Sequence, residues 1–137
     1  MLPLLLLDQR YAWLYIAPMG KSDGKSPYRL HGRVWIDGPD GDTFLGFGRV
    51  VLLERIGEHG SISAAARSMN MSYRHAWDLV DSMNRQAPRP LVESRAGGKG
   101  GGGARLTSAG KRAVEIFWSA WNDFKDFEKK RSQDIDF

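Results

Sequence analysis

The spacing of apolar residues changes along the chain from the alternation of a strand to the periodicity of a helix. Residues 30–37 alternate between apolar and other side chains, which predicts a short strand, and GPDGD at residues 38–42 is typical of a turn. From about Phe47 the apolar residues recur at a spacing of three, which predicts a helix. We expect that helix to end at Gly60, because glycine readily adopts the left-handed conformation that closes a helix.

Two short helices are predicted next, separated by a turn at residues 70–72. Ser61 or Ser63 is placed to cap the first helix and Ser72 to cap the second, since a serine hydroxyl can accept a hydrogen bond from a free N–H of the first turn. The run Ala64–Ala66 supplies the small side chains that two closely crossing helices need. This pattern favours a helix–turn–helix.

The second of these helices has one apolar face, formed by Ala76, Leu79, Val80 and Met83. Arg74 and Asp78 lie on the opposite face, which we expect to be exposed. If this helix enters a DNA major groove, Tyr73 and Arg74 lie in the turn that reaches base edges, and Arg74 can pair with a guanine. The alternative is a solvated ion pair between Arg74 and Asp78. We favour the DNA contact for Arg74 and the ion pair for Asp78.

A glycine-rich tip lies between two short predicted strands, residues 91–95 and 104–106, which predicts a β-hairpin. The tip contains Lys99 and has Arg95 and Arg105 at its ends. Basic side chains on a glycine-rich backbone suit contact with DNA phosphates or with the minor groove. A disordered loop without a role is the alternative.

The predicted elements define a mainly α protein with a small β-hairpin, in the α+β class. Thr107 is placed to cap a long last helix from about residue 108 to residue 131. We expect residues 1–29 to form an N-terminal arm or an extra element, residues 30–106 a winged helix–turn–helix domain, and residues 107–137 a long helix for dimerisation with a short tail.

Composition and charge narrow the possible functions. The 137 residues are 42% hydrophobic and 26% charged, and they include no cysteine, which excludes disulfides and thiolate metal sites. The three histidines match no metal-ligand spacing, so we expect no metal site. The net charge is +4, and residues 85–112 hold seven basic residues against one acid, which favours a polyanionic partner. The apolar run at residues 2–7 is too short to span a membrane.

Two stretches of the sequence resemble a family of bacterial regulators. Residues 60–84, GSISAAARSMNMSYRHAWDLVDSMN, resemble the helix–turn–helix of LysR-type regulators and, more closely, that of the molybdate-responsive ModE family. Residues 92–107, VESRAGGKGGGGARLT, resemble the wing of the ModE domain. The resemblance implies a dimeric winged helix–turn–helix that binds double-stranded DNA. The predicted DNA-contacting residues are Ser61, Ser63, Ser72, Tyr73, Arg74, His75, Arg95, Lys99 and Arg105.

An apolar stripe on the predicted last helix is too aromatic and too wide for a helix that lies alone on a surface. We interpret part of it as a dimer seam, with core packing alone as the alternative, and the ModE resemblance supports the dimer. Two-fold symmetry would place two recognition helices about one DNA turn apart, on an inverted-repeat operator. The predicted seam residues are Val114, Phe117, Trp118, Trp121 and Phe124.

These observations predict a sequence-specific transcriptional regulator of the ModE type, by default a repressor, that acts in the cytoplasm at the nucleoid. Its expected partners are double-stranded DNA and a second copy of itself, not a membrane. A winged-helix protein–protein adaptor without DNA readout is the alternative. No catalytic set is apparent, so we do not expect an enzyme. Full-length ModE-type regulators continue into a molybdate-binding region, whereas this sequence ends at Phe137, so we expect no cofactor.

Overall fold

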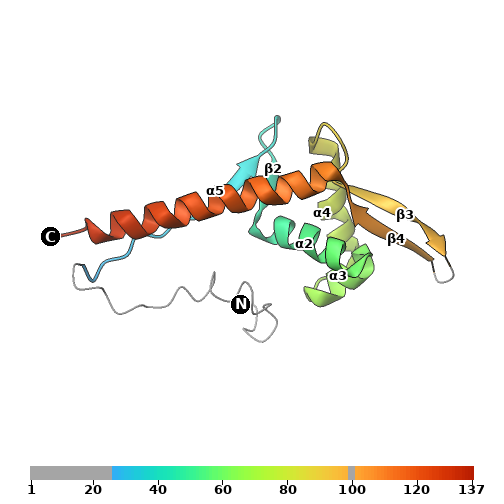
Figure 1. The fold of residues 1–137 in the computed structure, drawn as a ribbon, viewed down its shortest axis with the longest axis horizontal. Coiled ribbons are helices and arrows are strands. Elements are labelled where there is room, and N and C mark those ends of the chain that lie inside the picture. The colour runs from blue at the N-terminus through green and yellow to red at the C-terminus, as the bar shows by residue number, and fades with distance from the viewer. Residues whose placement is uncertain (1–25, 99–100) are drawn as a thin grey trace. The chain divides into compact units, whose positions relative to one another are not determined.

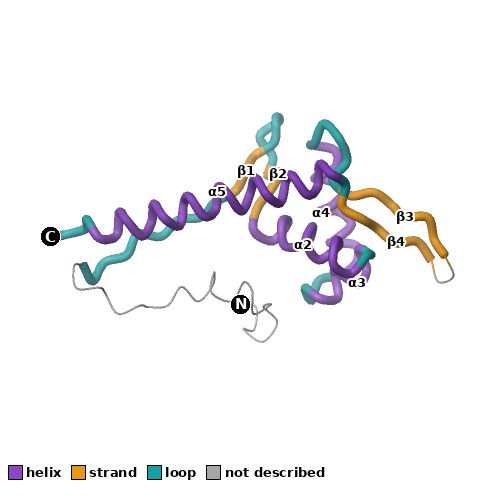
Figure 2. Tube along the Cα trace, viewed as in Figure 1, coloured by secondary structure: helices purple, strands orange, loops and turns teal. Residues whose placement is uncertain are grey.

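The computed structural model describes residues 26–98 and 101–137 (Figure 1). These residues form two compact units, one from Val34 to Ala120 and one that joins the residues up to Arg33 with Trp121–Phe137. Helices and two separate antiparallel strand pairs make up the described chain, which confirms the expected α+β class (Figure 2). The unit from Val34 to Ala120 contains the predicted helix–turn–helix.

Three helices form the centre of that unit: α2 (Phe47–His59), α3 (Ile62–Ser68) and α4 (Tyr73–Gln86). The helix α2 packs against both α3 and α4. It contributes more buried apolar side chains than any other element. Those of α2 are Val50, Val51, Leu52, Leu53 and Ile56. Ala65 and Ala66 of α3 are also buried, which agrees with the need for small side chains where the helices cross.

The ends of these helices follow the signals in the sequence. Gly60 closes α2 with a φ of 74°. The Oγ of Ser61 accepts a hydrogen bond from the N–H of Ala64 at 3.0 Å, so Ser61 rather than Ser63 caps α3. The Oγ of Ser72 accepts a hydrogen bond from the N–H of His75 at 3.1 Å and caps α4.

A hairpin of β1 (Trp35–Asp37) and β2 (Thr43–Gly46) precedes α2. The observed strand β1 is therefore shorter than the strand predicted over residues 30–37, and β2 was not predicted. The turn between the strands is where we expected it, with Gly41 at a φ of 85°. Gln86 Nε2 at the end of α4 donates a hydrogen bond to the Thr43 carbonyl oxygen of β2 at 3.0 Å, which ties this hairpin to α4.

The strands β3 (Val92–Gly98) and β4 (Gly101–Leu106) form the predicted wing, and both extend further toward the glycine tip than predicted. The wing is attached to the end of α2, because the N–H of Ala104 donates a hydrogen bond to the Gly60 carbonyl oxygen at 2.8 Å. A Cβ atom at Gly103 would lie 2.6 Å from that same oxygen. Glycine at position 103 therefore allows the two backbones to approach.

The long helix α5 spans Ser108–Gln133, and Thr107 caps it as predicted, its Oγ1 accepting a hydrogen bond from the Gly110 N–H at 3.0 Å. Within the unit that ends at Ala120, Phe117 is fully buried. The indole Nε1 of Trp118 donates to a carboxylate oxygen of Glu54 at 3.0 Å. This section of the apolar stripe therefore packs into the core of its own chain.

In the second unit, residues 26–33 are fastened to the last turns of α5. The N–H of Leu30 donates to Ser132 Oγ at 2.8 Å, and the N–H of Gly32 donates to Glu128 Oε1 at 2.8 Å. Ser132 and Glu128 are both buried. Helical side chains thus provide the hydrogen-bond partners for a backbone segment that belongs to neither described sheet.

Candidate DNA-binding surface

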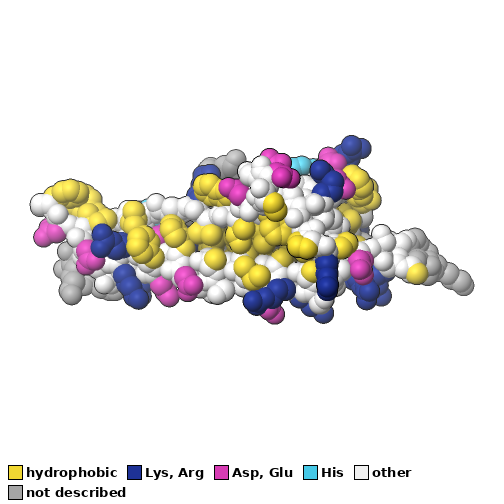
Figure 3. Space-filling view, turned by 90° about the horizontal axis from the view of Figure 1, so that it is seen from above, with side chains coloured by type: hydrophobic (Ala, Val, Ile, Leu, Met, Phe, Trp, Pro, Cys, Tyr) yellow, Lys and Arg dark blue, Asp and Glu magenta, His cyan; other side chains and the backbone are white. Residues whose placement is uncertain are grey.

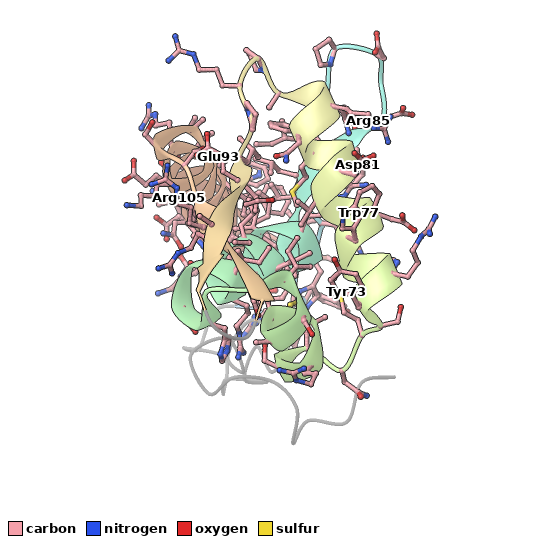
Figure 4. The ribbon with its side chains drawn as sticks, turned by 90° about the vertical axis from the view of Figure 1, so that its right-hand side faces the viewer. Tyr73, Trp77, Asp81, Arg85, Glu93 and Arg105 are labelled. Atoms are coloured by element: carbon pink, nitrogen blue, oxygen red, sulfur yellow. The ribbon has the colours of Figure 1, made fainter. Side chains whose placement is uncertain are left out.

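The first turn of α4 lies at the surface, and the residues that begin it, Ser72, Tyr73, Arg74 and His75, are all exposed. The opposite side of the helix is buried at Ala76, Val80 and Met83. The side chains of Tyr73, Trp77, Asp81 and Arg85 follow one another along α4 at intervals of four residues (Figure 4). The helix thus has a buried apolar back, and its exposed side carries Arg74 and Asp78, as the sequence predicts, together with the aromatic side chains of Tyr73 and Trp77.

Two ion pairs lie on the exposed side of α4. Arg74 Nε is 3.1 Å from Asp78 Oδ1 and 3.3 Å from Asp78 Oδ2. Nearer the C-terminus of the helix, Arg85 Nε is 2.8 Å from Asp81 Oδ2. Each arginine is thus balanced by one aspartate, so α4 offers an approaching polyanion little net attraction. Attraction to phosphates has to come from cations elsewhere in the unit.

Ser61 and Ser63 are half-buried at the start of α3. The Oγ of Ser61 is engaged in the helix cap, and the Oγ of Ser63 accepts a hydrogen bond from Arg67 Nη1 at 3.1 Å. Each hydroxyl therefore has a partner within the chain. Contact of these two serines with DNA stays a prediction.

The predicted basic residues of the wing differ in their surroundings. Arg95 and Arg105 are exposed. Arg105 Nη2 lies 3.0 Å from Glu93 Oε2 on the neighbouring strand, an ion pair that the sequence pattern does not predict (Figure 4). Lys99 lies outside the described residues.

One side chain that was not among the predicted site residues, Asn84, connects the wing to α4. Asn84 Oδ1 accepts hydrogen bonds from the N–H groups of Leu91 at 2.8 Å and Val92 at 3.2 Å, and Asn84 Nδ2 donates to the Val92 carbonyl oxygen at 3.0 Å. Asn84 follows Trp77 by two helical turns, so both lie on one flank of α4. No local pattern distinguishes this asparagine from a solvated one, because its partners lie beyond the proline-containing loop.

Comparison with known proteins shows which regulators the domain is similar to. A family profile described as "Bacterial regulatory helix-turn-helix protein, lysR family" matches residues 47–111. The molybdenum transport protein ModE of Azotobacter vinelandii is 47% identical over 78 residues, which are 57% of this chain and 29% of that protein. The chain carries a ModE-like helix–turn–helix domain.

Two further relatives of the ModE-like domain have similar names. The transcriptional regulator ModE of Haemophilus influenzae is 45% identical over 69 residues, which are 50% of this chain and 27% of that protein. The DNA-binding transcriptional dual regulator ModE of Escherichia coli K12 is also 45% identical over 69 residues, which are 50% of this chain and 26% of that protein. The matched part of this chain thus spans between a quarter and a third of the length of these relatives.

The predicted seam residues lie at different depths. Phe117 belongs to the core of the unit from Val34 to Ala120 and has no surface to offer a partner, while Val114 and Trp118 are half-buried. Trp121 and Phe124 belong to the second unit, where the first is buried and the second half-buried. Hydrophobic side chains do reach the surface along α5 (Figure 3), and among them Ile116 is 43% exposed. Sequence periodicity alone does not separate an inner apolar face from an adjacent outer one.

Among the residues that the structure describes, no group of three or more histidine, aspartate or glutamate side chains is arranged to hold a metal ion. The described helices also include none that is both long enough and apolar enough to cross a membrane.

Proposed function

We propose that this protein is a ModE-like transcriptional regulator that acts in the cytoplasm and binds double-stranded DNA sequence-specifically, with α4 in the major groove. The observation that carries the proposal is the exposed first turn of α4, held outward by a buried apolar back. A recognition helix contacts base edges through its N-terminal residues. A close relative named as a DNA-binding regulator supports this role.

Base reading and phosphate binding fall to different parts of the domain in this proposal. The paired charges of α4 leave the helix nearly neutral, so Arg74 is suited to contact a guanine edge rather than to attract DNA phosphates. Phosphate contacts fall to exposed cations outside α4, which include Arg67 and Arg95, and to Lys99 by its place in the sequence. Repression follows if the bound protein blocks access of RNA polymerase to a promoter.

Replacing Arg74 by alanine is expected to weaken binding to the cognate site by about ten-fold or more, because one bidentate arginine–guanine contact provides about 1–3 kcal/mol of discrimination. Binding to random duplex should change much less. Fluorescence anisotropy on a duplex selected from genomic fragments, and on its scrambled counterpart, measures both affinities. Arg131→Ala, which removes an exposed arginine of the second unit, is the matched control.

The salt dependence of the same binding curves tests the proposed function as a whole. Contacts to several phosphates make affinity fall steeply as salt rises. A protein–protein adaptor would have no affinity for duplex DNA even at low salt, and equal loss on cognate and random DNA in Arg74→Ala would remove the base-reading role from Arg74.

We further propose that the regulator is a homodimer through α5, which would present two copies of α4 to an inverted repeat. Ile116 is the exposed large apolar side chain in the part of α5 that belongs to the unit from Val34 to Ala120. Replacing it with glutamate is expected to weaken dimerisation by about ten-fold or more, since two carboxylates would be buried near the two-fold axis. Sedimentation equilibrium measures the dissociation constant of the dimer. Lys111→Glu, on another side of α5, should leave it unchanged, and an unaffected Ile116→Glu dimer would place the seam elsewhere.

A further inference from the structure

The ion pair at the start of α4 leaves part of the Arg74 guanidinium available. Both hydrogen bonds between Arg74 and Asp78 use the Nε–H of the arginine, at 3.1 and 3.3 Å from the two carboxylate oxygens. Within the described part of the chain, no hydrogen bond engages the terminal Nη1 and Nη2 atoms of Arg74. The exposed ion pair and a contact of Arg74 with DNA are therefore compatible rather than competing.

The free Nη atoms match the chemistry of one base. A guanidinium carries five N–H donors in a fixed planar fork, and guanine presents two acceptors, O6 and N7, side by side in the major groove. With the Nε edge held by a carboxylate, the Nη1–Nη2 end of the fork can still donate to both acceptors. An unrestrained arginine has about 2 kcal/mol of rotamer entropy to lose when it binds, and a side chain already held in one direction loses less.

We propose that Asp78 is a positioning residue for DNA recognition, which holds the Arg74 guanidinium so that its two Nη atoms face a guanine edge. This inference rests on the proposed function of the protein. It assigns to Asp78 an effect on specificity, although a carboxylate on a DNA-facing helix is repelled by phosphates and by itself lowers affinity for any duplex.

The ion pair between Arg74 and Asp78 contributes little to the stability of the protein. Arg74 and Asp78 are 83% and 51% exposed, and exposed ion pairs typically contribute about 0–1 kcal/mol. The same helix contains a matched pair, Arg85 with Asp81, also joined through the arginine Nε and also exposed. Because Arg85 lies in the last turn of α4, its partner Asp81 provides an internal control with the same charge on the same helix.

The test compares Asp78→Ala, Asp81→Ala and Arg74→Ala on a duplex selected by the wild-type protein. Each guanine of the site is replaced in turn by 7-deazaguanine, which lacks the N7 acceptor. We expect one replacement to weaken wild-type binding by about ten-fold, and expect Arg74→Ala to be insensitive to it. Asp81→Ala should keep the wild-type sensitivity, Asp78→Ala should lose most of it, and Asp78→Asn, which retains one oxygen acceptor, should keep an intermediate value.

Binding to a scrambled duplex separates positioning from damage to the fold. Asp78→Ala and Asp81→Ala should both bind scrambled DNA slightly more tightly than the wild type, since each removes one negative charge. Loss of discrimination together with a gain in general affinity cannot arise from unfolding. Full sensitivity to 7-deazaguanine in Asp78→Ala, an equal loss in Asp81→Ala, or the absence of any guanine that depends on Arg74 would overturn the inference. Absence of wild-type DNA binding at low salt would instead overturn the proposed function, and the inference with it.

Discussion

Replacing Gly110 by alanine is expected to lower the free energy of unfolding by about 3 kcal/mol, although the same exchange usually stabilises a helix. A Cβ atom at position 110 would lie 2.2 Å from the carbonyl oxygen of Leu91 and 3.2 Å from Leu106 Cδ2. The obstacle is a backbone atom that already accepts a hydrogen bond from the Thr107 N–H at 3.0 Å. Relief of the clash therefore has to shift the junction between the wing and α5.

Gly48→Ala provides the matched control, because Gly48 also lies in a helix and a Cβ atom there would meet nothing within 4 Å. We expect this second exchange to be neutral or to stabilise the protein by about 0.5–1 kcal/mol, through the reduced entropy of the unfolded chain. Urea denaturation of both variants measures the two changes in the free energy of unfolding. An unchanged or raised stability of Gly110→Ala would show that the start of α5 is not packed against Leu91 as described.

The helices of the ModE-like domain were predictable because their determinants are local. Ser61, Ser72 and Thr107 each cap the helix that follows, because the hydroxyl oxygen accepts a hydrogen bond from an N–H only three residues away. Gly60 ends α2 through its own backbone conformation. Such signals depend on neighbours in the sequence and act in the same way wherever the helix lies in the fold.

The features that escaped prediction depend on partners far along the chain. The strand β2 occupies only the four residues between the predicted turn at residues 38–42 and the helix that begins at Phe47, and its partner is β1. Phe117 has the spacing of a seam residue but packs in its own core. The ion pair of Glu93 with Arg105 depends on the register of the wing, which its glycine-rich strands do not specify.

The candidate site shows the same division between local and distant determinants. Exposure of Arg74 could be derived from helical periodicity, and its pairing with Asp78 was foreseen as an alternative to DNA contact. Periodicity gives the side of the helix on which a residue lies but not the atom through which it bonds. The use of Nε by Arg74, which reconciles the two interpretations, required the geometry of the side chains.

Replacing Asn84 by alanine is the second change expected to have a large effect, a loss of about 3 kcal/mol in the free energy of unfolding. The change would leave two N–H groups and one carbonyl oxygen of Leu91 and Val92 without their partners. Both residues are nearly inaccessible to water, and each buried polar group left unpaired costs about 1–3 kcal/mol. Asn84→Asp should lose less, since a carboxylate oxygen can still accept from both N–H groups.

The same variant tests whether Asn84 sets the position of the wing relative to α4. Leu91 lies where three elements meet, because its N–H is bonded to α4 through Asn84 and its carbonyl oxygen to the cap of α5 through Thr107. In Asn84→Ala we therefore expect faster hydrogen exchange of the Leu91 and Val92 amides. We also expect weaker binding to cognate and random duplex alike, because a displaced wing loses phosphate contacts, which carry no sequence information. A loss confined to the cognate duplex, with unchanged exchange, would instead make Asn84 a base-reading residue.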